Sequence, residues 1–253
     1  ADVADSYLFY GILPASAVKS APSDLTEWVV TVPSTQTPST TSWDGDADPM
    51  IIEPMTVSYS SGLQSQKVRF AHLFGFGKLT FAGLESSYSD QIVQSVTISA
   101  TGSNKDLAGS FQVDLTGQIK DIIPAPESTS SSITIMGDGK TTLSDFKAWF
   151  VANPGTYDVT IKAVTGNADI VFKRTGLVIE RSKIASPTVN FKESSDNITT
   201  KEVDLSGGLV WSHTQSASKI IRSTAQHRQP VRIIPSIAPF HLFRSDQIIG
   251  RVF

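Results

Sequence analysis

The sequence predicts an all-β protein folded as an antiparallel β-sandwich, and three observations support that prediction. Apolar and polar residues alternate along the middle of the chain, as they do in strands that bury one face. Clusters of glycine, asparagine, aspartate and serine separate these stretches at short intervals, which is typical of turns between antiparallel strands. The chain also contains 34 serines and 24 threonines, and these residues disfavour long helices.

The expected elements follow from these patterns. Phe111, Val113 and Leu115 alternate with polar neighbours, and the stretch 157–163 repeats the pattern. Weaker alternation predicts further strands at 68–70, 79–81, 96–98, 133–135, 170–172 and 177–179. Two segments rich in proline or hydroxyl residues, 33–54 and 124–132, are expected to be loops.

Composition argues against several classes of function. The formal net charge is −3 and 18% of the residues are charged, so neither a nucleic acid nor an anionic membrane is expected as a partner. The lack of cysteine excludes disulfides, cysteine-ligated zinc and a thiol nucleophile. No apolar run reaches the length of a membrane span, and residues 1–5 show no signal-peptide pattern. If the protein is exported, we expect its targeting segment to have been removed from this chain.

A change in composition near Ser194 predicts a domain boundary at about residue 195. From His213 to Phe253 the chain has six basic residues and one acidic residue, and it loses the clean alternation seen earlier. We therefore expect a β-sandwich domain at 1–195. Residues 196–253 are expected to form a poorly defined basic C-terminal extension or an incomplete second module.

Asp44, Asp46 and Asp48 form the strongest local candidate for a metal site. Alternating carboxylates in a loop can converge on a hard cation such as calcium. An EF-hand loop requires glycine at its sixth position and glutamate at its twelfth, and this chain has Pro49 and Met55 there. The alternative interpretation is a solvated turn in which the three carboxylates share no ligand.

The sequence shows no catalytic constellation. It has neither a His-Glu-x-x-His nor a Gly-x-Ser-x-Gly motif. Residues 139–141, Gly-Lys-Thr, lack the earlier glycine of a phosphate-binding loop, because position 134 is threonine. His72 is expected to be a core or sheet-face histidine, and Arg174 and Arg181 are expected at solvated strand ends. We therefore predict a protein that is not an enzyme and requires no cofactor.

Several segments follow one another in an order found in a known family. An aromatic strand runs into a Pro-Ala turn at 9–15, a Pro-x-x-Gln-x-Pro segment follows at 33–38, and a Ser-Trp-Asp loop ending in Ala-Asp follows at 42–48. The later segments are 68–74, 78–81, 92–100, 107–109 and 149–154. In this order the chain resembles, over about residues 6–192, the fimbrillin-like proteins of Bacteroides-type bacteria, which supply pilus subunits and related outer-membrane lipoproteins.

The resemblance implies a transthyretin-like β-sandwich at the cell surface, in the outer membrane or in a fimbria of a Gram-negative bacterium. The family assembles by donor-strand exchange, in which a strand of one subunit completes the sheet of the next. The implied partners are other pilus subunits or surface proteins, and a membrane only through a lipid anchor. The chain departs from the family because it has no lipobox cysteine and because 196–253 does not resemble a second β domain.

We therefore expect a non-catalytic surface protein that works in adhesion or fimbria assembly. If the tail supplies a donor strand, the candidate segments are 231–237 and 247–253. The alternative function is that of a surface lipoprotein that binds host or dietary glycans, because aromatic faces stack on sugars. A flat, exposed row of tryptophan rings would favour glycan binding, and buried rings beside a free sheet edge would favour assembly. The four tryptophans are Trp28, Trp43, Trp149 and Trp211.

Overall fold

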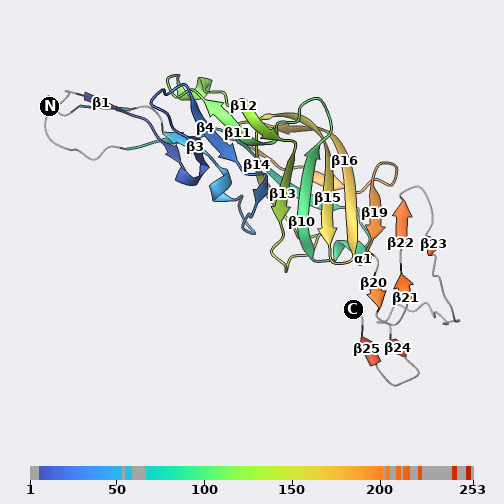
Figure 1. Cartoon of the computed structure of the whole chain (residues 1–253). Coiled ribbons are helices and arrows are strands. Elements are labelled where there is room, and N and C mark those ends of the chain that lie inside the picture. Colours follow the sequence, from blue (N-terminus) through green and yellow to red (C-terminus); the bar gives the residue numbers. More distant parts are fainter. Residues whose placement is uncertain are drawn as a thin grey trace. The chain divides into compact units, whose positions relative to one another are not determined.

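The fold is all-β and contains several sheets, most of whose neighbouring strands are antiparallel (Figure 1). The structure is a computed structural model that describes residues 6–52, 55–58 and 67–201, and beyond these the backbone of short strands between 203 and 251. The prediction of an all-β protein is therefore confirmed.

The chain divides into two compact units. The first comprises Ala1–Lys201 together with His213–Ser223, and the second comprises Glu202–Ser212 together with Thr224–Phe253. The first unit thus continues past the boundary expected at residue 195. The change in charge that motivated that boundary does not coincide with the end of strand pairing, because the segment 197–200 still belongs to a sheet of the first unit.

The largest sheet of the first unit has eight strands. In sheet order they are β23 (Arg222–Ser223), β22 (His213–Ser216), β19 (Asn197–Thr200), β16 (Ala168–Ile179), β15 (Gly155–Thr165), β10 (Val93–Ala100), β13 (Ser132–Met136) and β5 (Thr35–Gln36). The strand predicted at 157–163 is the centre of β15. The strands predicted at 170–172 and 177–179 are parts of one strand, β16, in which Gly176 has a φ of +69°. A glycine adopts this conformation without strain, so the strand continues past it.

Three smaller sheets complete the main body of the first unit. One has the order β12 (Ala125–Ser130), β11 (Ala108–Val113), β4 (Trp28–Val32) and β3 (Val18–Ser20). A second contains β14 (Ala148–Ala152), β9 (Gly75–Ala82), β17 (Ile184–Ala185) and β18 (Thr188–Asn190). A third contains β2 (Ile12–Leu13), β6 (Met50–Ile52) and β8 (Phe70–His72).

The other elements are short. Two-stranded sheets pair β1 (Ser6–Phe9) with β7 (Met55–Ser58), β20 (Val203–Leu205) with β21 (Leu209–Trp211), and β24 (His241–Phe243) with β25 (Ile249–Arg251). The helical turns are η1 (Ala15–Ala17), η2 (Gly45–Ala47), α1 (Ser86–Ser89) and η3 (Ile119–Asp121). Part of 33–54, expected to be a loop, therefore forms β5, η2 and β6.

The expectation of a loop at 124–132 is wrong. Residues 125–130 form β12, an edge strand that pairs with β11 along most of its length. The alternation signal is missing because nearly every residue of β12 is exposed, so no buried apolar face marks it. Pro126 lies beside a register shift in this pairing, which is a position where a strand tolerates proline.

One hydrophobic core joins the sheets of the first unit. Its buried residues come from the eight-stranded sheet and from the sheets of β4, β6 and β9. Aromatic contacts link parts of this core: the ring centroids of Phe81 on β9 and Phe172 on β16 are 5.4 Å apart, and those of Phe74, just before β9, and Phe111 on β11 are 5.1 Å apart. Such aromatic pairs stabilise a core beyond the area that they bury.

A buried glutamine links two of these sheets at neighbouring edges. Gln36 lies on β5, at the edge of the eight-stranded sheet, and its side chain is fully buried. Its Oε1 accepts the backbone N–H of Val151 on β14 at 2.8 Å, and its Nε2 donates to the carbonyl of Val151 at 2.8 Å and to that of Pro33 at 3.0 Å. The amide thus takes the place of a neighbouring strand for Val151, which is itself fully buried.

Replacing this amide should destabilise the protein markedly. In Gln36→Leu, the buried N–H and C=O of Val151 lose their partner, which we expect to lower the free energy of unfolding by about 2–4 kcal/mol. The neighbouring Thr35→Ala, at an exposed position, is the matched control and should change it by less than about 0.5 kcal/mol. Urea unfolding followed by circular dichroism measures both. Equal stability of the two variants would contradict the role of Gln36.

Candidate functional site

The candidate site is the side of β19 on which β22 pairs; without β22 and β23, β19 would be the edge of the eight-stranded sheet, and we call this side the edge at β19. β19 pairs antiparallel with β16 on one side, at 168–171. On its other side it pairs antiparallel with β22, which reaches it from beyond residue 212. Residues 203–205 and 209–211, which lie between β19 and β22 in sequence, form the hairpin β20–β21 in the second unit. The chain therefore leaves the first unit after Lys201 and returns to add a strand to its sheet.

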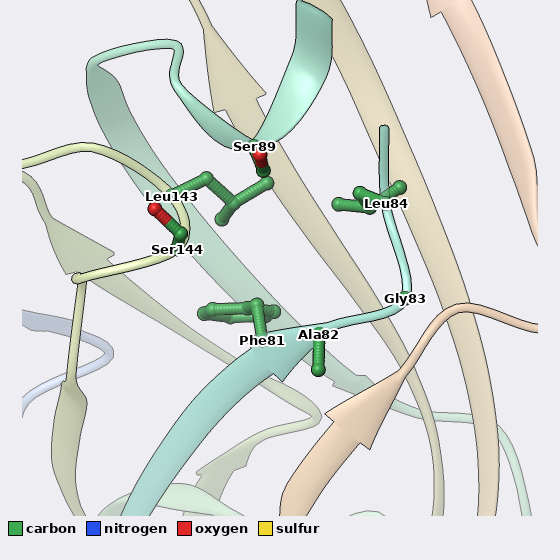
Figure 2. A pocket seen from close by; sticks show the side chains of 7 residues that line it. All are labelled: Phe81, Ala82, Gly83, Leu84, Ser89, Leu143 and Ser144. Atoms are coloured by element: carbon green, nitrogen blue, oxygen red, sulfur yellow. The ribbon is translucent and has the colours of Figure 1, made fainter. Parts of the chain in front are cut away.

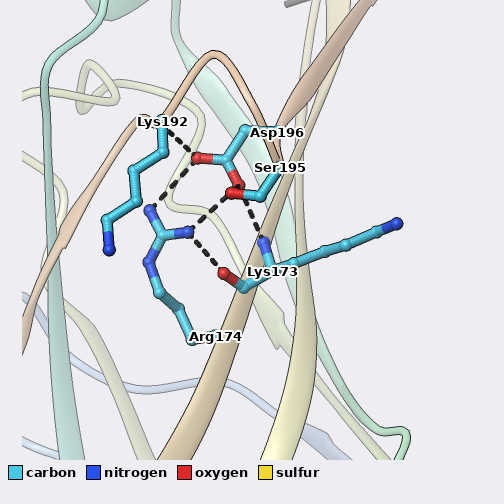
Figure 3. A network of polar contacts seen from close by, with 5 residues as sticks. All are labelled: Lys173, Arg174, Lys192, Ser195 and Asp196. Atoms are coloured by element: carbon cyan, nitrogen blue, oxygen red, sulfur yellow. Dashed lines mark hydrogen bonds and ion pairs between the residues drawn. The ribbon is translucent and has the colours of Figure 1, made fainter.

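Asp196 fixes the start of this edge strand (Figure 3). Its carboxylate accepts the backbone N–H of Lys173 at 2.9 Å and that of Lys192 at 2.5 Å. The hydroxyl of Ser195 donates to it at 3.2 Å, and the guanidinium of Arg174 donates to both carboxylate oxygens, at 3.0 and 3.2 Å. One carboxylate thus joins β16 to the turn that leads into β19.

This carboxylate has no exposed side-chain surface, and the Arg174 side chain is 18% exposed. A buried charge is tolerated only when it is paired and fully hydrogen-bonded, and the five donors around Asp196 meet that requirement. No local pattern predicts this cluster, because Arg174 and Asp196 are 22 residues apart and 194–197 has the composition of an ordinary polar turn.

The expectation of solvated strand ends is wrong for both arginines. Arg174 is largely buried by its pairing with Asp196. The Nε of Arg181 donates to the carbonyl of His72 at 2.9 Å, and its guanidinium also donates to the carbonyl of Ile122 at 2.7 Å. Burial lowers the pKa of Arg181. Both side chains therefore act as long-range cross-links within the first unit.

The three aspartates of the calcium hypothesis do not converge in the structure. Asp44 accepts the backbone N–H groups of Thr37 and Asp46, and Asp46 accepts the hydroxyl of Ser16. Asp48 turns into the protein and pairs with another residue. Within the part of the chain that the structure describes, no group of three or more His, Asp or Glu side chains could hold a metal ion. The calcium site stays a prediction without support from this arrangement.

Asp48 pairs with His72. The Nδ1 of His72 lies 2.9 Å from one carboxylate oxygen and 3.0 Å from the other, and the indole Nε1 of Trp43 donates to the same carboxylate at 3.3 Å. Burial raises the pKa of Asp48, and its contacts with His72 and Trp43 oppose that shift. His72 is thus a sheet-face histidine, as expected, but its acidic partner was not foreseen, because the two residues are 24 positions apart.

The described tryptophans do not form an exposed row. Trp43 stacks on Phe76 with ring centroids 4.0 Å apart, and Trp149 meets Trp43 at 6.2 Å with a 60° angle between the rings. The amine of Lys78 lies over the ring of Trp149, at 5.3 Å from its centroid. Trp28 packs against the core and donates its N–H to the carbonyl of Pro22. The side chain of Trp211 lies outside the described residues.

The loop at 137–147 is built around Asp138, not around a bound phosphate. The Asp138 carboxylate accepts the hydroxyl of Thr141 and the backbone N–H groups of Lys140 and Thr141. These hydrogen bonds, of which the one from the hydroxyl has the largest effect, lower the pKa of Asp138 to about 2. A carboxylate that occupies the backbone donors in this way would repel a phosphate, so the Gly-Lys-Thr sequence is a capped turn.

A small cavity lies where β9 ends. It has a volume of about 150 Å³ and is lined by Phe81, Ala82, Gly83, Leu84, Ser89, Leu143 and Ser144. Figure 2 shows apolar side chains around this space together with the hydroxyls of Ser89 and Ser144. None of these lining residues is ionisable, so the cavity offers no acid, base or charged ligand group.

The segment 231–237, one candidate donor strand, lies outside the described residues. The other, 247–253, contributes Ile249–Arg251 to β25, which pairs with β24. Among the residues that the structure describes, no helix combines the length and the hydropathy needed to cross a membrane.

Comparison with known proteins gives distant structural neighbours only. No family model and no curated protein matches the chain. A "putative cell adhesion protein" from Bacteroides uniformis ATCC 8492 is 17% identical, with a TM-score of 0.47 over 77% of this chain and 70% of that one. A protein of the same description from Bacteroides ovatus ATCC 8483 is 15% identical, with a TM-score of 0.48 over 79% and 67%. Likenesses at this level carry no functional argument, so the proposals below rest on the residues of this chain.

Removing the buried carboxylate should both destabilise the protein and loosen the edge strand. In Asp196→Ala the Arg174 guanidinium and two backbone N–H groups lose their partner, and we expect a loss of about 3–5 kcal/mol in the free energy of unfolding. Hydrogen exchange of the β19 amides should accelerate more than that of the β15 amides. The exposed pair Lys19–Glu127 provides the control, since Glu127→Ala should cost at most about 1 kcal/mol. Similar losses for both variants would refute the anchoring role.

Proposed function

We propose that the protein is a non-catalytic cell-surface protein that works in adhesion or fimbria assembly, through addition of a strand to the edge at β19. The observation that supports this proposal is the pairing of β22 with β19, in which a strand from the segment after residue 201 adds to the sheet of the first unit. Strand addition binds through main-chain hydrogen bonds to an exposed sheet edge, and β19 would offer such an edge to another subunit when its own β22 is displaced. In the proposed assembly, the β22 strand of one subunit completes the sheet of the next.

The position of β22 in sequence supports exchange between subunits. The segment between Lys201 and His213 leaves the first unit, so the strand is attached by a connection and is not fixed by a tight turn to β19. Exchange of an identical element between copies of a chain keeps every contact of the original pairing. The finer architecture that we propose for the main body is a transthyretin-like β-sandwich.

The alternative, glycan binding by a surface lipoprotein, has less support. Sugar stacking requires an accessible ring face, and the described tryptophans contact Phe76, Lys78 or the core. The sheet edge at β19 therefore favours assembly over glycan recognition. We also propose that the protein is attached to the outer membrane and that its partners are other pilus subunits.

Proline substitutions in β22 test the assembly. In the double variant Thr214→Pro/Gln215→Pro, two neighbouring N–H groups are removed, and one of them faces β19 because successive N–H groups point to opposite sides of a strand. We expect the unaltered chain to form oligomers and the variant to be monomeric, as measured by size-exclusion chromatography with light scattering. The matched control Thr214→Val/Gln215→Val retains both N–H groups and should assemble like the unaltered chain.

A chain shortened to end at Lys201 lacks β22, so it tests whether the edge at β19 can bind a strand supplied from outside. This cut keeps Asp196 and the bond from the Lys201 backbone N–H to the Asn167 carbonyl, which a cut at 195 would remove. We expect a labelled peptide of residues 209–219 to bind this shortened chain in fluorescence anisotropy. The same peptide with both prolines should not bind. A monomeric full chain together with no peptide binding would refute strand addition, and binding of glycans to both forms would favour the alternative.

A further inference from the structure

The imidazole of His72 has one ring nitrogen paired inside the protein. Its Nδ1 lies 2.9 Å and 3.0 Å from the two carboxylate oxygens of Asp48, a side chain that is only 4% exposed. Because a carboxylate accepts a hydrogen bond, Nδ1 carries the proton, and in the neutral ring Nε2 then carries the lone pair. The His72 side chain is 34% exposed. The pairing with Asp48 therefore leaves Nε2 as the nitrogen that can bind a ligand.

The surroundings hold this imidazole in one orientation. The indole Nε1 of Trp43 donates to the Asp48 carboxylate at 3.3 Å, which fixes the carboxylate in turn. The rings of Trp43 and Phe76 meet the imidazole at nearly right angles, with centroids 6.3 Å and 5.0 Å away. A histidine that ligates a metal almost always donates its other ring N–H to a carboxylate, a carbonyl or water, which fixes the tautomer and makes the ligating nitrogen more basic. His72 has this arrangement.

A methionine is the cross-strand neighbour of this histidine. Met50 on β6 is directly opposite His72 on β8 in the register of the two antiparallel strands. Residues opposite each other in such a pair lie on the same face of the sheet, with Cβ atoms about 4.5–5.5 Å apart. The methionine side chain is unbranched, has three rotatable bonds and contains a polarisable sulfur. The thioether of Met50 can therefore reach the ligand that Nε2 of His72 binds.

We propose that His72 and Met50 form a binding site for a soft monovalent cation, Cu(I), with Nε2 and Sδ as the protein ligands and Asp48 as the residue that positions the imidazole. Thioether sulfur selects Cu(I), and imidazole suits copper as well. The cation would also offset the negative charge of the buried Asp48 carboxylate, with which the imidazole is paired.

The ligand set argues against other common metal ions. Calcium takes six to eight oxygen ligands, and structural zinc takes four ligands in a tetrahedron. The described part of the chain has no group of three or more His, Asp or Glu side chains that could hold a metal ion. One imidazole and one thioether therefore favour a soft ion over zinc or calcium. The site lies on β6 and β8, away from the strand pairing of the proposed function, so each proposal can fail without the other.

Ag(I) is a suitable first probe, because it is a soft monovalent ion that does not change its oxidation state in air. The full chain contains three methionines, and their methyl groups can be labelled with ¹³C and observed by NMR. We expect one equivalent of Ag(I) to shift the Met50 methyl signal, which Met50→Leu assigns. Met136 on β13 is 41% exposed and is the internal control, whose signal should stay in place. No shift at Met50, or an equal shift at Met136, would overturn the proposal.

The affinity for Cu(I) tests the two ligands separately. It is measured without oxygen, with ascorbate as reductant and a chromogenic Cu(I) chelator as competitor. Met50→Leu conserves size and apolar character but removes the sulfur, and it should weaken Cu(I) binding by at least about tenfold, since even partners outside the ligand set typically matter by 10–100-fold. His72→Gln should lower the affinity at least as much. Met136→Leu is the matched control and should bind like the parent. If Met50→Leu binds Cu(I) as tightly as the parent does, the site is wrong.

Asp48→Asn tests the positioning role. An amide can donate as well as accept, so it no longer forces the proton onto Nδ1. We expect the ¹⁵N signals of the His72 ring to show a larger share of the other tautomer, and the Cu(I) affinity to fall by about tenfold. Thermal unfolding followed by circular dichroism verifies that the variant is folded. An unchanged tautomer together with an unchanged Cu(I) affinity would contradict the role of Asp48 in the proposed site.

Discussion

The junction at Gln36 is the constraint on which the arrangement of the sheets depends. β5 and β14 belong to different sheets, and no backbone pairing joins them, yet Val151 is fully buried and needs partners for its N–H and C=O. The glutamine amide provides a donor and an acceptor in the spacing of a peptide group. The two sheets can therefore share one core at this edge without leaving unpaired polar groups inside it.

The remaining strand edges differ in how they are protected against pairing, and the assembly that we propose depends on this difference. β12 is exposed but carries Pro126 and the charged Glu127, and both kinds of residue discourage pairing at an edge strand. The carbonyl of His72 on β8 is occupied by Arg181 and Ser182. By contrast, the start of β19 is tied to β16 through Asp196, and β19 pairs with β22 on its other side. In the proposed assembly, an incoming strand would pair at β19 in preference to the other sheet edges, because those edges are protected against pairing.

The sequence allowed strands with one buried face to be predicted: alternation alone located the centre of β15 and the last three residues of β11, although the pattern at 111–115 runs past the end of β11, since Leu115 lies in a turn. It did not allow β12 to be predicted, because a strand exposed on both faces has no periodic apolar signal. The buried polar contacts could not be predicted from the sequence either. Asp196 with Arg174, Asp48 with His72, and Gln36 with Val151 join residues 22, 24 and 115 positions apart, and local spacing contains no information about such pairs.

The Asp196 cluster also has a mechanical consequence. A tension applied through β22 passes to β19 and reaches β16 beside the point where five hydrogen bonds converge on one carboxylate. Three of these bonds, from the Lys173 N–H and the Arg174 guanidinium, join Asp196 to β16, and they resist the load together because they share a single acceptor group. The cluster thus works as a tether against pulling in a chain that has no disulfide for the purpose.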